Sequence, residues 1–318
     1  MANYAIALAG APVVLPVDPD DVLWFGRMLE EKGVNLRARM NPALEAARDL
    51  ALFVYVTQQV AAMAPASVRL EGCPPPNFDL PLATAVISLI RSFRRALSRD
   101  PDLFDSAWRV IAGGASVAIP QPQTSDRDHV WEVLNAAVYS QFATEVELNE
   151  SGAGADVKGT FEGVRWGIEC KVLYSTKVAR RIDRIIDGVR QIEDDASVKK
   201  GVVIINTTDC IDHAPFHRSL SSDPVVFRST EQVTAALAAA VKRVAVETST
   251  RSLQQRVVSD KHGNRRVKCR AIIYLGQTVA RAAGHVHVFT SQISVVRRPA
   301  EVTDKIFAER YHVGWRNL

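Results

Sequence analysis

The pattern of apolar positions divides the chain into two parts. Before about residue 114, apolar residues recur three and four positions apart, which predicts helices near residues 20–32, 42–63, 82–98 and 102–111. Prolines and small polar residues at 73–76 and 120–125 cannot continue a helix. We take the second break as a boundary between a mainly helical N-terminal domain at 1–120, for targeting, regulation or assembly, and a second domain at 121–318.

The second part alternates between helical and strand periodicity. Apolar runs and period-two alternation predict strands at 144–148, 156–161, 166–173, 201–206, 270–275 and 286–296. Helices are predicted at 128–142, 176–195 and 230–247, and the apolar stripe of the second consists of Val178, Ile182, Ile185, Ile186, Val189 and Ile192. This order predicts an α/β fold with a mixed central sheet flanked by helices.

The strands at 156–161 and 166–173 carry the residues with the clearest chemical meaning. If Glu162 and Gly163 form a two-residue turn, paired residue numbers sum to 325, so Asp156 lies directly opposite Glu169. Lys171 then shares their face of the sheet, because side chains alternate along a strand. We expect the intervening side chain of Cys170 to point to the other face.

A carboxylate pair at this spacing favours a divalent cation. Two such charges about 5 Å apart repel by about 3 kcal/mol at an effective dielectric near 20. Mg²⁺, or Mn²⁺ in its place, prefers oxygen ligands and keeps positions open for a phosphate. We expect Asp156 and Glu169 to hold the ion, with the backbone carbonyl of Cys170 as a further ligand and Lys171 as the catalytic lysine. Glu132, on the preceding helix, is a candidate auxiliary acid and ligand.

These residues resemble the PD-(D/E)xK nuclease superfamily, which has the restriction-endonuclease-like fold. The match runs from about residue 125 to 210: a helix with Glu132, a strand, Asp156, then Glu169-Cys170-Lys171, a helix and a strand. Ala155 stands where the family often has proline. The resemblance implies Mg²⁺-dependent cleavage of nucleic acid, and a glutamine equivalent in position to Gln191 approaches the site in some relatives.

Basic residues near this motif are candidates for contact with nucleic acid. The helix at 176–195 would begin near the site, and a predicted hairpin tip around 260–264 is also basic. A plain solvated face, or a charged edge that discourages aggregation, remains the alternative for both. The candidates are Arg180, Arg181, Arg184, Gln191, Lys261, Arg265 and Arg266.

Ordinary alternatives exist for the acidic residues too. Glu169 and Lys171 could be a solvated surface pair, and Glu132 could be a plain acid on a helix surface. The paired histidines at 213 and 217 and at 285 and 287 lack a third ligand nearby in sequence, so we interpret both pairs as structural.

Composition restricts the possible partners and cellular location of the protein only loosely. The chain of 318 residues is 47% hydrophobic and 23% charged, and its net charge of +4 permits a polyanionic partner without requiring one. The four cysteines are far apart, and no apolar run is long enough to span a bilayer, so we expect a cytoplasmic protein with reduced thiols and no membrane partner.

The sequence therefore predicts a Mg²⁺-dependent endonuclease that acts on DNA, for example in restriction or anti-phage defence. One alternative is a nucleic-acid-binding or assembly protein that keeps the fold without turnover. Another is a nuclease that acts on RNA, because the active site alone does not distinguish the sugars. A homodimer, a partner protein or an activating ligand would each be compatible with this interpretation.

Overall fold

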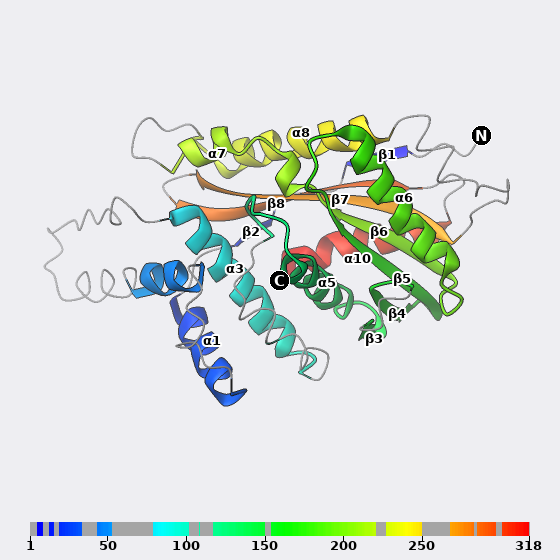
Figure 1. Cartoon of the computed structure of the whole chain (residues 1–318), viewed down its shortest axis with the longest axis horizontal. Coiled ribbons are helices and arrows are strands. Elements are labelled where there is room, and N and C mark those ends of the chain that lie inside the picture. Colours follow the sequence, from blue (N-terminus) through cyan, green and yellow to red (C-terminus); the bar gives the residue numbers. More distant parts are fainter. Residues whose placement is uncertain are drawn as a thin grey trace, which may run out of the picture.

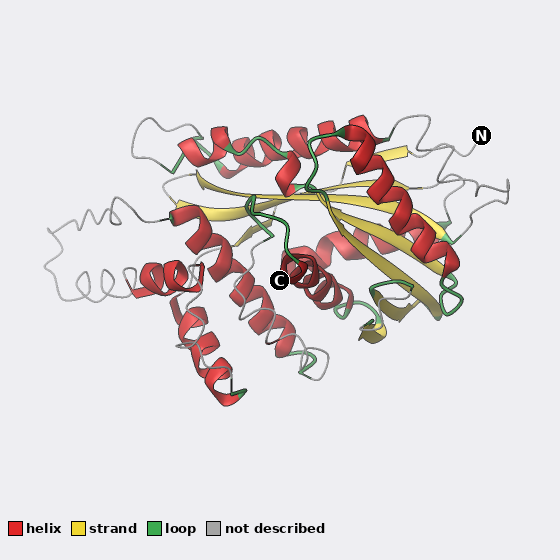
Figure 2. Ribbon diagram, viewed as in Figure 1, coloured by secondary structure: helices red, strands yellow, loops and turns green. Residues whose placement is uncertain are grey.

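A computed structural model describes residues 5–8, 13–15, 19–33, 43–52, 79–101, 108, 117–149, 154–220, 227–249, 268–282, 285–296 and 301–317. Together these residues form an α/β protein in which a mixed sheet carries helices on both faces (Figures 1 and 2). None of the helices described is long and apolar enough to cross a membrane.

The sheet has the strand order β1-β8-β7-β6-β5-β4-β3, with β2 also pairing to β8. Its main body consists of β3 (Thr144–Leu148), β4 (Val157–Phe161), β5 (Val164–Val172), β6 (Lys200–Asn206), β7 (Cys269–Ala282) and β8 (His285–Val296). Strands β5, β6 and β7 are parallel, and the other pairs are antiparallel. The prediction of a mixed α/β sheet is confirmed.

Two short strands from the N-terminal region extend this sheet. Strands β1 (Ala5–Leu8) and β2 (Val13–Leu15) both pair antiparallel with β8. The apolar pattern did not predict them, because each is shorter than the period-two runs that identify a strand. The N-terminal region therefore contributes strands to the sheet as well as helices.

Helices form a layer on each face of the sheet. Figure 2 shows α6 (Val178–Asp194), α7 (Ala214–Arg218) and α8 (Thr230–Thr248) on one face, and α3 (Leu80–Leu97), α5 (Ser125–Tyr139) and α10 (Val302–Asn317) on the other. Helix α1 (Pro19–Glu31) packs against α3, and a short 3-10 turn follows β6 at Thr208–Cys210. The central strands β5, β6 and β7 are thus buried on both sides.

Most predicted elements agree with the structure, and the differences are specific. Strand β7 is longer than the predicted 270–275, and Val178 is exposed at the start of α6 instead of completing its apolar stripe. Helix α10 was not predicted, although Phe307, Tyr311 and Trp315 recur every four residues and are buried. Of the predicted helix at 42–63 the structure describes residues 43–52, and of that at 102–111 only Trp108; the rest lies outside the described residues.

The β4–β5 hairpin has the predicted register. Its turn residues, Glu162 and Gly163, have φ angles of 51° and 71°, as a type I′ two-residue turn requires. Phe161 pairs with Val164, and the ladder continues to Val157 opposite Ile168. This register decides which side chains meet at the far end of the hairpin.

One hydrophobic cluster joins the N-terminal helices to the sheet. It includes Phe93 from α3 and Trp108, whose rings meet edge to face with centroids 5.6 Å apart, together with Trp166 of β5 and Phe307 of α10, which stack at 4.5 Å. Such a shared core couples the stability of the two regions. The domain boundary near residue 120 stays a prediction.

Candidate metal and phosphodiester site

Asp156 lies where β4 separates from β5. It directly precedes β4, and its Oδ2 accepts a hydrogen bond of 2.7 Å from the backbone N–H of Cys170. The carboxylate thus takes the place of the next backbone partner in the ladder. Because the N–H and C=O of one strand residue point to the same side, the Cys170 carbonyl is directed toward this edge as well.

Glu169 and Lys171 project from β5 toward α6, on the face opposite to Ile168 and Cys170. Glu169 is 0% exposed and Lys171 is 6% exposed. The Lys171 ammonium donates to Oε1 of Glu169, and the carboxyl groups of Glu169 and Asp156 lie within hydrogen-bonding reach of each other. Among the residues described, no N–H or hydroxyl group donates to Oε2 of Glu169. A buried carboxylate oxygen left in this state is costly unless something positive reaches it.

A glycine of α6 makes room for this pair. A Cβ atom at Gly188 would lie 3.2 Å from Cγ of Glu169, 3.5 Å from Cε of Lys171 and 3.0 Å from a methyl of Val203. Helix α6 therefore passes directly over the two side chains. A glycine inside a helix is otherwise unfavourable, and the close approach explains its presence here.

Burial and like charge perturb the two carboxyl groups in the metal-free protein. Burial raises the pKa of Glu169 to about 9; the negative charge of Asp156 and a hydrogen bond between the two carboxyl groups add to this effect, while Lys171 opposes it. The pKa of Asp156 rises to about 6, again through burial first, with a smaller contribution from Glu132 that Lys171 offsets. A cation bound between them would replace the protons that they otherwise hold.

Helix α5 brings further polar side chains to the carboxyl end of β5, although it packs against the opposite face of the sheet. Oε2 of Glu132 lies 2.8 Å from Nδ1 of His129, and the charge of Glu132 contributes to the raised pKa of Asp156. Tyr174, just after β5, donates a hydrogen bond of 2.8 Å to Asp128. Burial raises the pKa of Asp128, and the charges of Glu132 and Lys171 also act on it.

Sequence reasoning missed Asp128, His129 and Tyr174. One signal was present for the first of them, because Asp128 precedes Glu132 by one helical turn and so shares its face of α5. Tyr174 gave no signal, since its approach to Asp128 depends on how α5 packs on the sheet.

The predicted nucleic-acid contacts have different surroundings. Arg181 is 7% exposed, and its guanidinium binds Glu247 of α8 and the carbonyl of Ser175, which ties α6 to its neighbours. Arg180 is exposed, and Arg184 is 3.6 Å from Asp128. Gln191 is half-buried further along α6, toward its C-terminal end. Lys261, Arg265 and Arg266 lie outside the described residues.

The donor set at Asp156 and Glu169 fits a hard cation. It consists of two carboxylates and a backbone carbonyl, all oxygen, and one buried carboxylate oxygen has no N–H or hydroxyl donor among the described residues. Among the residues described, no three His, Cys, Asp or Glu side chains converge as a ready metal cage. An ion held here would therefore keep open positions for water and substrate oxygens.

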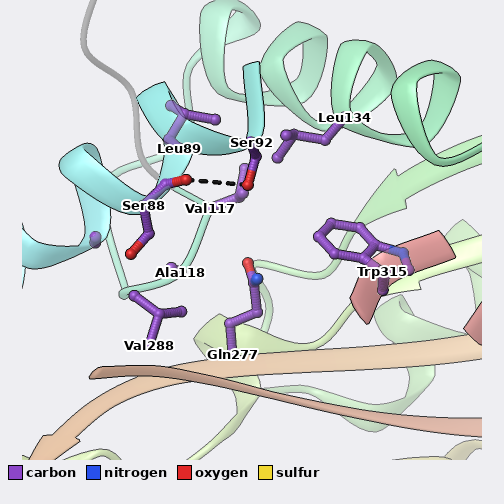
Figure 3. Close-up of a pocket in the computed structure, with 10 residues that line it drawn as sticks. Ser88, Leu89, Ser92, Val117, Ala118, Leu134, Gln277, Val288 and Trp315 are labelled. Carbon is purple, nitrogen blue, oxygen red and sulfur yellow. Dashed lines mark hydrogen bonds between the residues drawn. The ribbon is translucent and has the colours of Figure 1, made fainter. Parts of the chain in front are cut away.

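A separate cavity lies between α3 and the sheet (Figure 3). Ser88 and Ser92 of α3, Gln277 of β7 and Trp315 of α10 contribute to its wall, and Ser92 donates to the Ser88 carbonyl. None of the predicted site residues lines it. The cavity is distinct from the candidate site at Asp156 and Glu169.

No family model matches the chain, and neither a curated protein nor a solved structure is detectably similar to it.

Proposed function

We propose that this protein is a metal-dependent nuclease that hydrolyses phosphodiester bonds in DNA. The observation that carries the proposal is the state of Glu169: a fully buried carboxyl group that meets the carboxyl group of Asp156, with one oxygen bound to Lys171 and no N–H or hydroxyl donor among the described residues on the other. The identities and spacing of Asp156, Glu169 and Lys171 support it, because they resemble the motif of the PD-(D/E)xK superfamily.

In this proposal Asp156, Glu169 and the Cys170 carbonyl hold Mg²⁺. The bound ion would lower the pKa of a coordinated water and draw electron density from the scissile phosphate. Asp156 is oriented for binding by the N–H of Cys170, which already engages one of its oxygens. Glu132 acts from α5 as an auxiliary acid whose carboxylate His129 orients.

Lys171 has two tasks in the proposed reaction. Its ammonium holds Oε1 of Glu169, so the other oxygen is left for the ion. The same ammonium can orient the attacking water and stabilise negative charge that grows on the phosphate. Cover by α6 excludes bulk water, which strengthens both interactions.

The test is cleavage of supercoiled plasmid, linear duplex, single-stranded DNA and RNA in Mg²⁺, Mn²⁺ or EDTA. Asp156→Asn, Glu169→Gln and Lys171→Met are compared with Lys199→Ala, which removes an exposed lysine away from the site. We expect metal-dependent DNA cutting that the first three variants lose by at least about a hundredfold and the control keeps. Binding of DNA without any cutting would overturn the nuclease and favour a binding protein, and cutting of RNA alone would reassign the substrate.

A further inference from the structure

Asp128 connects the candidate site to a cation on α6. Its Oδ1 accepts the hydrogen bond from the Tyr174 hydroxyl at 2.8 Å, and its Oδ2 lies 3.6 Å from the Arg184 guanidinium. Asp128 also interacts electrostatically with Glu132 and Lys171. Because Tyr174 lies two residues beyond the end of β5, its hydrogen bond to Asp128 locates Asp128, Tyr174 and Arg184 at the carboxyl end of this strand, the end that carries Glu169 and Lys171. We call these three residues the arginine mount.

Arg184 differs from Arg181 and Arg190 of α6 in the position of its ion-pair partner, because Asp128 lies at the carboxyl end of β5. Arg181 is buried against Glu247, and Arg190 pairs at 3.2 Å with Asp187 of its own helix, where both side chains are more than half exposed. Arg184 is 42% exposed, so it reaches solvent, while its partner Asp128 is only 26% exposed and is anchored by Tyr174. A solvent-facing guanidinium is therefore held beside the site by a fixed carboxylate.

A polyanionic substrate needs such a cation here. Asp128 and Glu132 add negative charge at this end of the sheet beside the proposed metal ligands, and this charge repels an approaching phosphate. Arginine presents a planar fork of donors that fits phosphate oxygens, and a guanidinium already held in position loses little freedom on binding. Binding of a phosphate would use the donors of Arg184 that Asp128 leaves available.

We propose that the arginine mount is a phosphate-positioning site, in which Arg184 binds a DNA phosphate next to the scissile one and Asp128, fixed by Tyr174, orients Arg184. This inference rests on the proposed nuclease function and adds a specific subsite to it. Asp128 and Tyr174 are positioning residues that act through Arg184.

The first test compares Arg184→Gln with Arg190→Gln, because both remove one partly exposed, ion-paired arginine from α6. Binding of a short fluorescein-labelled DNA duplex is measured by anisotropy in Ca²⁺ at several salt concentrations. We expect Arg184→Gln to weaken binding about tenfold and to reduce the slope of log Kd against log salt by about 0.9, as loss of one phosphate contact does. Arg190→Gln should change neither quantity by more than about twofold.

The second test uses the sign of a charge effect. Asp128→Asn removes a negative charge, so general electrostatics alone predicts tighter binding of DNA. The arginine mount predicts the opposite, a severalfold weaker binding, and no further loss when Asp128→Asn is added to Arg184→Gln. Asp187→Asn is the matched control, because it removes the exposed partner of Arg190, and it should bind equally or more tightly.

The possible results distinguish failure of the arginine mount from failure of the proposed nuclease function. If wild-type protein neither binds nor cuts DNA, the proposed nuclease function fails and the subsite with it. If DNA is bound and cut but Arg184→Gln behaves like Arg190→Gln, or Asp128→Asn binds more tightly, the arginine mount is refuted and the nuclease stands. A loss seen with RNA and absent with DNA would overturn the choice of DNA. Melting temperatures of all variants identify any that are misfolded, and the half-exposed Arg184→Gln provides the binding test that least disturbs folding.

Discussion

Glu169→Gln should stabilise the metal-free protein increasingly as pH rises. In the folded state burial raises the pKa of Glu169 to about 9, whereas its ordinary value is 4.5. Between these values the folded protein keeps a proton that the unfolded chain has released, so the unfolded state gains stability with each pH unit. The contribution of Glu169 to wild-type stability is therefore fully present below its ordinary pKa and is lost as pH rises toward 9.

The size of this effect follows from the one proton that the folded protein binds and the unfolded chain does not. Each pH unit in this window changes the free energy of unfolding by up to about 1.4 kcal/mol, so raising the pH from about 5 to about 8 should lower it by up to about 4 kcal/mol. This is a large part of the 5–15 kcal/mol that typical domains possess. Glutamine has the same shape and can still accept a hydrogen bond from Lys171, but it has no proton to lose. The Glu169→Gln variant should therefore lack most of this decline.

The assay is urea unfolding in EDTA, followed by tryptophan fluorescence, at pH values from about 5 to about 8, where Glu169 is protonated in the folded protein and ionised in the unfolded chain. Glu309→Gln, on the exposed side of α10, is the control and should keep the wild-type dependence. Parallel curves for wild type and Glu169→Gln would refute the reasoning, because they would mean that Glu169 ionises in the folded protein as readily as in the unfolded chain.

Three other changes test the surroundings of the site and the core, all by urea unfolding. Gly188→Ala should lower stability by about 1 kcal/mol, because crowding against the buried Glu169–Lys171 pair exceeds the gain in helix propensity. Gly26→Ala on α1 is the control: a Cβ atom there has no neighbour within 4 Å, so this change should raise stability by about 1 kcal/mol. Equal effects of the two substitutions would contradict the close approach of α6. Burial alone would raise the pKa of Asp195, but hydrogen bonds from neighbouring O–H and N–H groups hold this pKa well below its usual range. Asp195→Asn should therefore lower the free energy of unfolding by about 2 kcal/mol at pH 7, and by progressively less as acid protonates the wild-type carboxylate. A loss of stability that stays the same at low pH would contradict this explanation. Ser88→Ala removes a buried hydroxyl with no described hydrogen-bond partner and should leave stability unchanged or raise it by up to about 1 kcal/mol, and a clear loss would show that the hydroxyl is bonded in solution.

Local patterns in the sequence predicted the part of the site that lies within one hairpin. The turn at Glu162 and Gly163 sets the β4–β5 register, and that register brings Asp156 to Glu169 and puts Lys171 on the same face as Glu169. The amphipathic stripe of α6 and the apolar run of β6 likewise predicted their burial. These features depend on residues close together in the chain, so periodicity and turn chemistry suffice to find them.

Other parts of the site depend on how distant segments pack. The contact of Tyr174 with Asp128 joins residues from the end of β5 and from α5, and the approach of Gly188 to Glu169 joins α6 to β5. The burial of Arg181 against Glu247 of α8 distinguishes it from the more exposed Arg184, which its helical position alone could not do. The pairing of β1 and β2 with β8 connects segments from the two ends of the chain.

The sequence by itself therefore determined most of the element types, the hairpin register and the acidic pair with its lysine, because turn geometry and side-chain alternation act over a few residues. Only the tertiary structure decided which face each helix covers, that Arg181 is buried while Arg184 reaches solvent, and how deeply Glu169 is buried. These properties arise when segments far apart in the chain pack together and exclude water from their contact surfaces. A pattern within a few neighbouring residues does not specify which distant segments meet.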